Sequence, residues 1–152
     1  MIEISDRQSQ RRQPRTRQKI NLRLLKEIAA AALEELKIID AELSVVIVGA
    51  KESAAMNEKF LGHEGPTDVI TFDYSEKPRQ LHGEIFICIE EAAKQAKEFK
   101  TNWQSELVRY VVHGILHLIG HDDLKPSARK KMKTVEGRLV RELSRRFALS
   151  KL

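Results

Sequence analysis

Apolar residues return along this chain with two different periods, which separate the expected helices from the expected strands. Over residues 22–38 they recur every three or four positions, as on one face of an amphipathic helix, and Asn21 stands at the capping position before it. Short β-rich runs over residues 43–48 and 84–89 predict buried strands, the first of which ends at Gly49. The chain therefore mixes both element types from its first third onward.

The remaining segments continue this mixture. Residues 68–74 alternate in polarity and predict a third strand, and the short segment 1–5 fits an edge strand. Further helices are expected over residues 51–60, 90–100, 106–120 and 126–147, with Ser105 capping the third of them and Pro126 opening the last. A small group of strands with about five helices predicts one α/β or α+β layer domain over residues 1–152.

Composition narrows the class of protein. With 152 residues and 41% apolar content, the chain has enough material for one buried core. The formal net charge of +5 and a pI of about 9.4 favour an anionic partner. A single cysteine, Cys88, excludes an intrachain disulfide framework and fits a reducing compartment. No secretory signal and no membrane-length apolar run is visible, so we expect a cytoplasmic protein without a membrane partner.

The candidate metal-ligating residues gather in one stretch, HGILHLIGHDD, which holds three of the chain's five histidines. His113 and His117 are four residues apart, so a helix places both imidazoles on one face, one turn from each other. They are either hydrogen-bonded core histidines or ligands of one metal ion. Burying two unpaired imidazoles among the apolar residues around them would cost about 1–3 kcal/mol each, which favours the metal ion.

A third ligand can follow the glycine bend after this helix. Gly120 is a natural helix-ending residue with positive φ, and the chain beyond it offers His121, Asp122 and Asp123. In HExxH metalloproteases a glutamate general base follows the first histidine, whereas here Gly114 stands at that place. The pattern therefore predicts a zincin-like metal helix that lacks the base needed for proteolysis.

The sequence resembles the YbeY family of endoribonucleases, the rRNA maturation factors. HGILHLIGHDD is similar to the family's HGxLHLxGYDH, and GPTDVITFDY is similar to its PTDVLSFP strand, with MNEKF at the matching distance before it. GEIFICIEEAAKQA resembles its GDIxIS strand and the helix that follows. The resemblance covers roughly residues 40 to 125 in the same order.

The resemblance implies a fold, a cofactor and an activity. It implies a small α+β domain with a mixed sheet and one Zn²⁺ held by three residues, which here are His113, His117 and Asp123. The implied activity is metal-dependent cleavage of single-stranded RNA in ribosomal RNA maturation and ribosome quality control, with the ribosome or a ribosomal subunit as partner.

Two positions depart from the family pattern. Asp123 stands where the family motif has a histidine; a carboxylate can ligate zinc at about 2.0–2.2 Å, and His121 is the rival third ligand. Leu61 stands where the family has an arginine, for which Lys59 or Arg79 would have to substitute. These departures leave an alternative open: a ribosome-associated, RNA-binding assembly factor with a structural metal and little hydrolytic activity.

Two further sets of residues have expected roles. Asp122 either orients a ligand histidine or takes a proton, or it only stabilises the turn. A basic arm and the basic last helix could follow an RNA backbone with little sequence preference. The candidate RNA-binding residues of the arm are Arg11, Arg12, Arg15 and Arg17.

Overall fold

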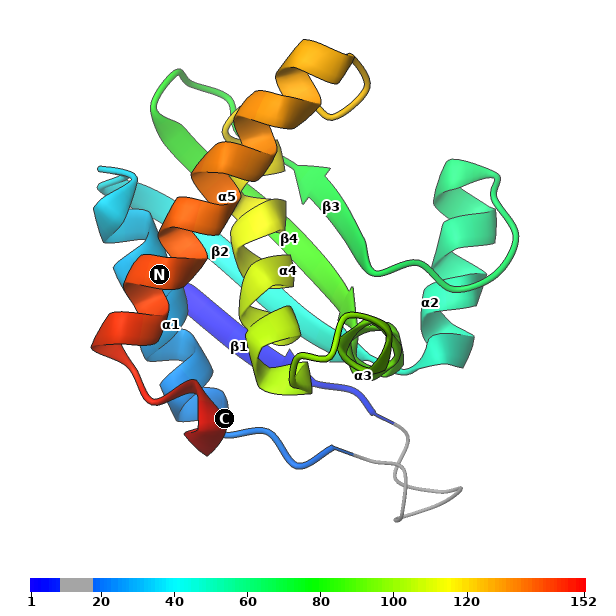
Figure 1. Cartoon of the computed structure of the whole chain (residues 1–152). Coiled ribbons are helices and arrows are strands. Elements are labelled where there is room, and N and C mark those ends of the chain that lie inside the picture. The colour runs from blue at the N-terminus through cyan, green and yellow to red at the C-terminus, as the bar shows by residue number, and fades with distance from the viewer. Residues whose placement is uncertain (9–17) are drawn as a thin grey trace.

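The computed structural model of this chain describes residues 1–8 and 18–152, which form a four-stranded sheet and the helices packed on it (Figure 1). The strands are β1 (Ile2–Asp6), β2 (Asp40–Val48), β3 (Val69–Asp73) and β4 (Gln80–Cys88). The helices are α1 (Leu22–Glu35), α2 (Ala50–Met56), α3 (Ile89–Glu98), α4 (Trp103–Leu118) and α5 (Pro126–Arg146). A π-helical turn, η1 (Asn57–Leu61), follows α2, and a 3₁₀ turn, η2 (Leu149–Lys151), lies near the C-terminus.

The sheet is mixed, with strand order β1-β2-β4-β3. β1 and β4 both run parallel to β2, and β3 runs antiparallel to β4. The α+β class with a mixed sheet and five helices is thus confirmed. β2 and β4 are longer than their apolar cores predicted, because pairing from Asp40 opposite Gln80 onward extends both strands into polar residues.

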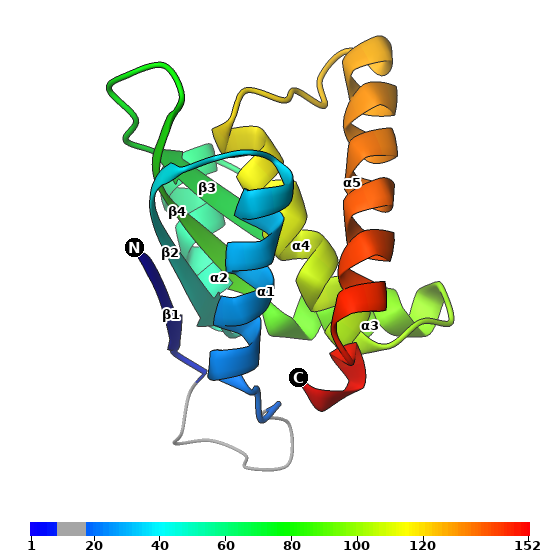
Figure 2. The ribbon, with the colours of Figure 1, turned by 90° about the vertical axis from the view of Figure 1, so that its left-hand side faces the viewer.

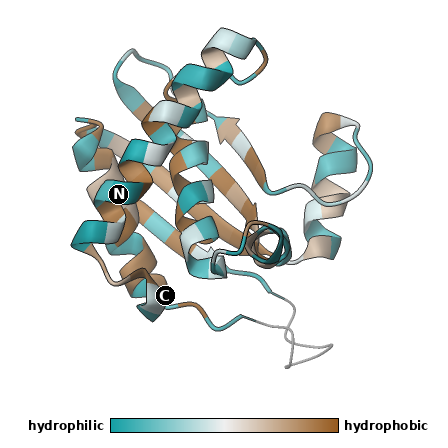
Figure 3. Cartoon of the chain, in the orientation of Figure 1, coloured by the Kyte–Doolittle hydropathy of each residue, from teal (hydrophilic) through white to brown (hydrophobic). Residues whose placement is uncertain are grey.

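α1, α4 and α5 form two layers on one face of the sheet. α1 and α4 lie directly on the strands, and α5 packs on α4 and α1 from outside (Figure 2). The central strands carry many hydrophobic residues (Figure 3), and Leu25, Ile85, Ile115 and Leu143 are fully buried in the core that the sheet forms with these helices. On the other face a smaller cluster gathers around Phe86. The main core therefore lies between the sheet and α4. Its contacts hold α4 in place against the strands.

Two glycines let α4 approach β4 closely. A Cβ atom added at Gly114 would lie 2.7 Å from Cδ1 of Ile85, and one added at Gly83 would lie 2.8 Å from Cδ2 of Leu118. Neither position has room for a side chain. The place at which a zincin protease has its glutamate base is therefore filled by the packing of the helix against the sheet.

The N-terminal ends of two helices confirm one prediction and correct another. Asn21 caps α1 as expected, with its Oδ1 accepting a hydrogen bond from the Leu24 N–H at 3.1 Å. α4 begins at Trp103 and not after Ser105, because the side chain of Asn102 accepts the Ser105 N–H at 2.8 Å and is itself the cap.

The helix expected over residues 51–60 is also interrupted. α2 ends at Met56 and the chain continues as the wider turn η1, whose buried Asn57 donates its side-chain amide to the Gly65 carbonyl at 2.8 Å. Across the ranges that the structure describes, no helix has the length and apolar character needed to cross a membrane.

Candidate metal centre

After α4 ends, the chain bends back toward the last turn of that helix. Gly120 has φ +100°, as its position after the helix predicted. The Gly120 N–H donates to the His117 carbonyl at 3.1 Å, and the His121 N–H donates to the Leu116 carbonyl at 2.9 Å. This pair of bonds is the Schellman arrangement, which closes a helix on a left-handed residue. It directs the segment after Gly120 back along the helix.

Three potential ligand atoms meet at this bend. Nε2 of His117 lies 3.1 Å from Nε2 of His113 and 3.7 Å from Oδ2 of Asp123. The ligand atoms of all three residues lie within 4.8 Å of one another. Donors that hold a tetrahedral zinc ion at about 2.0–2.1 Å are about 3.3 Å apart, so the donor set and its spacing fit such an ion. The site would need only small side-chain adjustments to bind it.

His121 lies outside this group in the part of the chain that the structure describes. Its side chain is partly buried, and burial, followed by the charges of Lys131 and His117, lowers its pKa. The backbone bend thus directs Asp123 toward His117, while His121 occupies the second position past the helix cap.

The sequence interpretation missed one residue of this site, Glu136 of α5. Its Oε1 lies 2.7 Å from Nδ1 of His113, and its Oε2 accepts from Nη1 of Arg109 at 3.1 Å. Glu136 is buried, with 7% of the residue's surface exposed. A carboxylate on Nδ1 keeps the proton on that nitrogen and leaves Nε2 for a metal, as in many histidine metal sites.

This contact shifts both groups toward their charged forms. Burial acts to lower the pKa of His113, but the hydrogen bond to Glu136 and the charges of Glu136, Asp68 and Asp123 outweigh it, so the pKa is raised. Burial acts to raise the pKa of Glu136, but its bonds to His113 and Arg109 hold the pKa below the usual value. The contact therefore favours the charged forms of both the imidazole and the carboxylate.

The other candidate residues differ in what the structure shows of them. Asp122 accepts the Leu124 N–H on Oδ1 at 2.7 Å, so one of its oxygens stabilises the turn. In η1, the side chain of Leu61 is half exposed, and Nζ of Lys59 lies 5.2 Å from the ring centroid of Phe60. The predicted RNA-binding residues of the arm, Arg11, Arg12, Arg15 and Arg17, lie outside the described residues.

Comparison with known proteins shows which family this chain is similar to. The family model described as Endoribonuclease YbeY matches residues 3–144. Endoribonuclease YbeY of Chlorobium phaeobacteroides is 35% identical over 121 residues, covering 80% of this chain and 84% of that protein. Endoribonuclease YbeY of an Anaeromyxobacter species is 37% identical over 121 residues, covering 78% of this chain and 63% of the relative's length. A solution structure of a Thermotoga maritima protein matches with 31% identity and a TM-score of 0.65, covering 94% of this chain and 89% of that one.

Proposed function

The chain belongs to the YbeY family of endoribonucleases, and from that premise we propose that it is a metal-dependent endoribonuclease of single-stranded RNA. The observation that carries the proposal is the convergence of His113, His117 and Asp123 within 4.8 Å. Residues 1–152 would form one catalytic domain. We propose that it acts in ribosomal RNA maturation and ribosome quality control. Its proposed partner is the ribosome or a ribosomal subunit, in the cytoplasm.

The proposed metal ligands are Nε2 of His113, Nε2 of His117 and a carboxylate oxygen of Asp123. Zn²⁺ accepts two imidazoles and a carboxylate, and three protein donors leave a coordination position for solvent or phosphate. The added negative charge of Asp123 also suits other divalent ions, such as Mn²⁺ or Fe²⁺. Asp123 is preferred over His121 because its carboxylate already lies 3.7 Å from His117.

A bound ion would polarise a phosphate oxygen or lower the pKa of a water molecule toward about 7. Residues of the chain would orient the ligands, accept a proton and bind the RNA. Glu136 keeps the His113 ring oriented through Nδ1, and Arg109 holds the second oxygen of Glu136. Asp122 is the proposed proton acceptor beside the site, with its rotamer held by the Leu124 N–H. Arg11, Arg12, Arg15 and Arg17 are proposed to hold the RNA backbone.

One observation favours a second candidate function. The half-exposed Leu61 offers no cation at the place where the sequence comparison led us to expect an arginine. A protein that binds ribosomal RNA through its basic surfaces and uses the metal only structurally would tolerate that change. This assembly-factor alternative predicts RNA binding without cleavage.

One experiment separates the two functions. Zinc-loaded wild-type protein, the His117→Ala variant and the His63→Ala variant are incubated with end-labelled single-stranded RNA, and with casein as a protease substrate. His63 is a suitable control because it is an exposed histidine in the loop after η1. We expect RNA cleavage by the wild type and by His63→Ala, none by His117→Ala, and no cleavage of casein. RNA binding without cleavage at every divalent ion tried would favour the assembly factor.

A further inference from the structure

The first half of α5 carries a concentrated positive charge. Between Asp123 and Glu136 the sequence contains no acidic residue. The cations of this segment are Lys125, Arg129, Lys130, Lys131 and Lys133. Like charges so close together repel one another, and an anion bound among them would relieve that repulsion.

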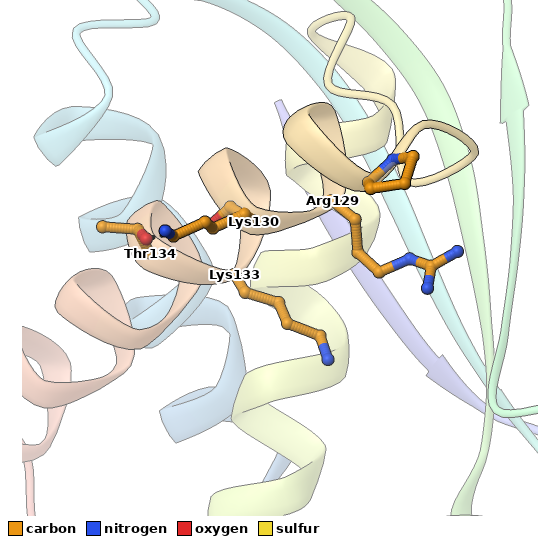
Figure 4. A pocket seen from close by; sticks show the side chains of 5 residues that line it. Arg129, Lys130, Lys133 and Thr134 are labelled. Carbon is orange, nitrogen blue, oxygen red and sulfur yellow. Dashed lines mark hydrogen bonds between the residues drawn. The ribbon is translucent and has the colours of Figure 1, made fainter.

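Part of this segment lines a pocket of about 430 Å³, which Figure 4 shows from close by. Its lining residues recur at helical spacing along one flank of α5 and are Pro126, Arg129, Lys130, Lys133 and Thr134. In Figure 4 the side chains splay apart on this flank, with Arg129 and Lys133 on one side of it and Lys130 and Thr134 on the other. No carboxylate and no aromatic ring lines this pocket.

The charges of the pocket have no acidic partner among residues 1–8 and 18–152. The opposite end of the same helix differs: Arg145 pairs with Glu142 at 3.2 Å, and Arg146 pairs with Glu35 at 3.3 Å. The C-terminal cations are therefore partly neutralised within the protein. Those of the pocket remain available to an external anion.

The pocket adjoins the candidate metal centre. Nε of Arg129 donates to the backbone carbonyl of Asp123 at 3.0 Å, so a pocket residue holds the loop that carries a proposed metal ligand. Glu136, which contacts His113, follows Arg129 by two helical turns and lies on nearly the same side of α5. An RNA strand bound at the metal centre would thus have this pocket beside it.

We propose that this pocket binds a phosphodiester group of the RNA strand that is cleaved at the metal centre. The proposal rests on the proposed function and adds a subsite to it. Lysine and arginine side chains neutralise backbone phosphates. Because no aromatic side chain is present for base stacking, the pocket should hold the backbone without regard to base sequence.

The test compares two double charge reversals of the same kind. Lys130→Glu with Lys133→Glu changes the pocket, whereas Lys94→Glu with Lys97→Glu changes two exposed lysines at the same spacing on α3. Binding of zinc-loaded protein to a short, cleavage-resistant 2′-O-methyl oligouridylate is measured by fluorescence anisotropy over a series of salt concentrations. Thermal unfolding and zinc affinity are measured for both variants, to confirm that the fold and the metal centre are intact.

We expect the pocket variant to bind this RNA roughly tenfold more weakly at moderate salt, with a salt dependence lowered by about 1.4 in log–log slope, as for two lost contacts to single-stranded phosphates. The α3 variant should bind like the wild type. In cleavage assays the pocket variant should raise KM and leave kcat nearly unchanged. Equal weakening by both variants, or no weakening by the pocket variant, would overturn the proposal.

Two further outcomes separate the possible failures. Loss of binding to anionic phosphatidylserine vesicles in the pocket variant, with unchanged RNA affinity, would assign the pocket to a membrane surface and overturn the proposal. If the wild type binds RNA through the pocket but never cleaves it, the proposed function fails and the phosphate site remains. If the wild type cleaves RNA and the pocket variant has the same KM, only the phosphate site fails.

Discussion

Nδ1 of His113 lies 2.7 Å from Oε1 of Glu136, a residue 23 positions further along the chain on another helix. The contact joins α4 to α5 at the point where the proposed metal ligands meet. Arg109 contacts the other oxygen of the same carboxylate. The orientation of His113 therefore depends on the packing of two helices as well as on the local geometry of α4.

Replacing Glu136 by alanine should weaken zinc binding by about 10–100-fold, because the His113 ring loses the acceptor that fixes its tautomer and orientation. Glu136→Gln keeps an acceptor oxygen and should fall between alanine and the wild type. Zinc affinity is measured by competition with a chromogenic chelator. Glu142→Ala on the same helix is the control, since the Glu142 carboxylate pairs with Arg145 at 3.2 Å near the other end of α5. Equal zinc affinity in Glu136→Ala and wild type would refute this role.

Zinc affinity should also depend on pH through His113. Its pKa is raised above the ordinary value of 6.5, so its proton is bound more tightly than on a free imidazole. Below that raised pKa, zinc must displace a proton from His113, and the apparent affinity falls as the pH is lowered. In Glu136→Gln the fall should begin at a lower pH, because the largest of the contributions that raise the pKa of His113 is removed. A chelator competition series over pH measures both curves, and coincident curves would contradict the assignment.

Gly114→Ala should destabilise the protein by about 1–3 kcal/mol, since the added methyl group overpacks the contact between α4 and Ile85. Gly137→Ala on α5 is the matched control. Its added Cβ would meet only Nη1 of Arg141 at 3.4 Å, and the gain in helix propensity should stabilise the protein by up to about 1 kcal/mol. Urea unfolding measures both changes. A neutral Gly114→Ala would show that α4 can move away from β4 at little cost.

The same contact can be tested by a double-mutant cycle. Ile85→Ala removes the side-chain atoms that a Cβ at Gly114 would meet, at the cost of a cavity. The double variant should therefore be less destabilised than the two single changes predict when added, by about 1 kcal/mol or more. Additive effects would mean that the methyl group added at position 114 does not clash with the Ile85 side chain.

The local part of the candidate metal centre could be predicted from sequence, because the rules that shape it act over a few residues. The spacing of His113 and His117 fixes their common face, and Gly120 forms the expected left-handed bend. Glu136 could not be placed in the same way, because its contact depends on the packing of α5 against α4. One signal was present: Glu136 lies in the apolar stripe of α5, between the buried Met132 and Leu139.

Element boundaries were less predictable for a similar reason. The apolar runs located the buried centres of β2 and β4, but the pairing of the two strands, which sequence periodicity does not report, extends each of them. The cap of α4 was misassigned because both Asn102 and Ser105 are residues that favour this position. The hydrogen bond between them, in which Asn102 is the acceptor, decides between the two.

The most direct test of the central claim is a titration of zinc into metal-free protein. We expect the wild type and His121→Ala to bind one zinc ion per chain with similar affinity. His113→Ala, His117→Ala and Asp123→Ala should each lose more affinity than the 10–100-fold typical of an outer contact. Unchanged binding in Asp123→Ala together with loss in His121→Ala, or no stoichiometric zinc in the wild type, would contradict the account.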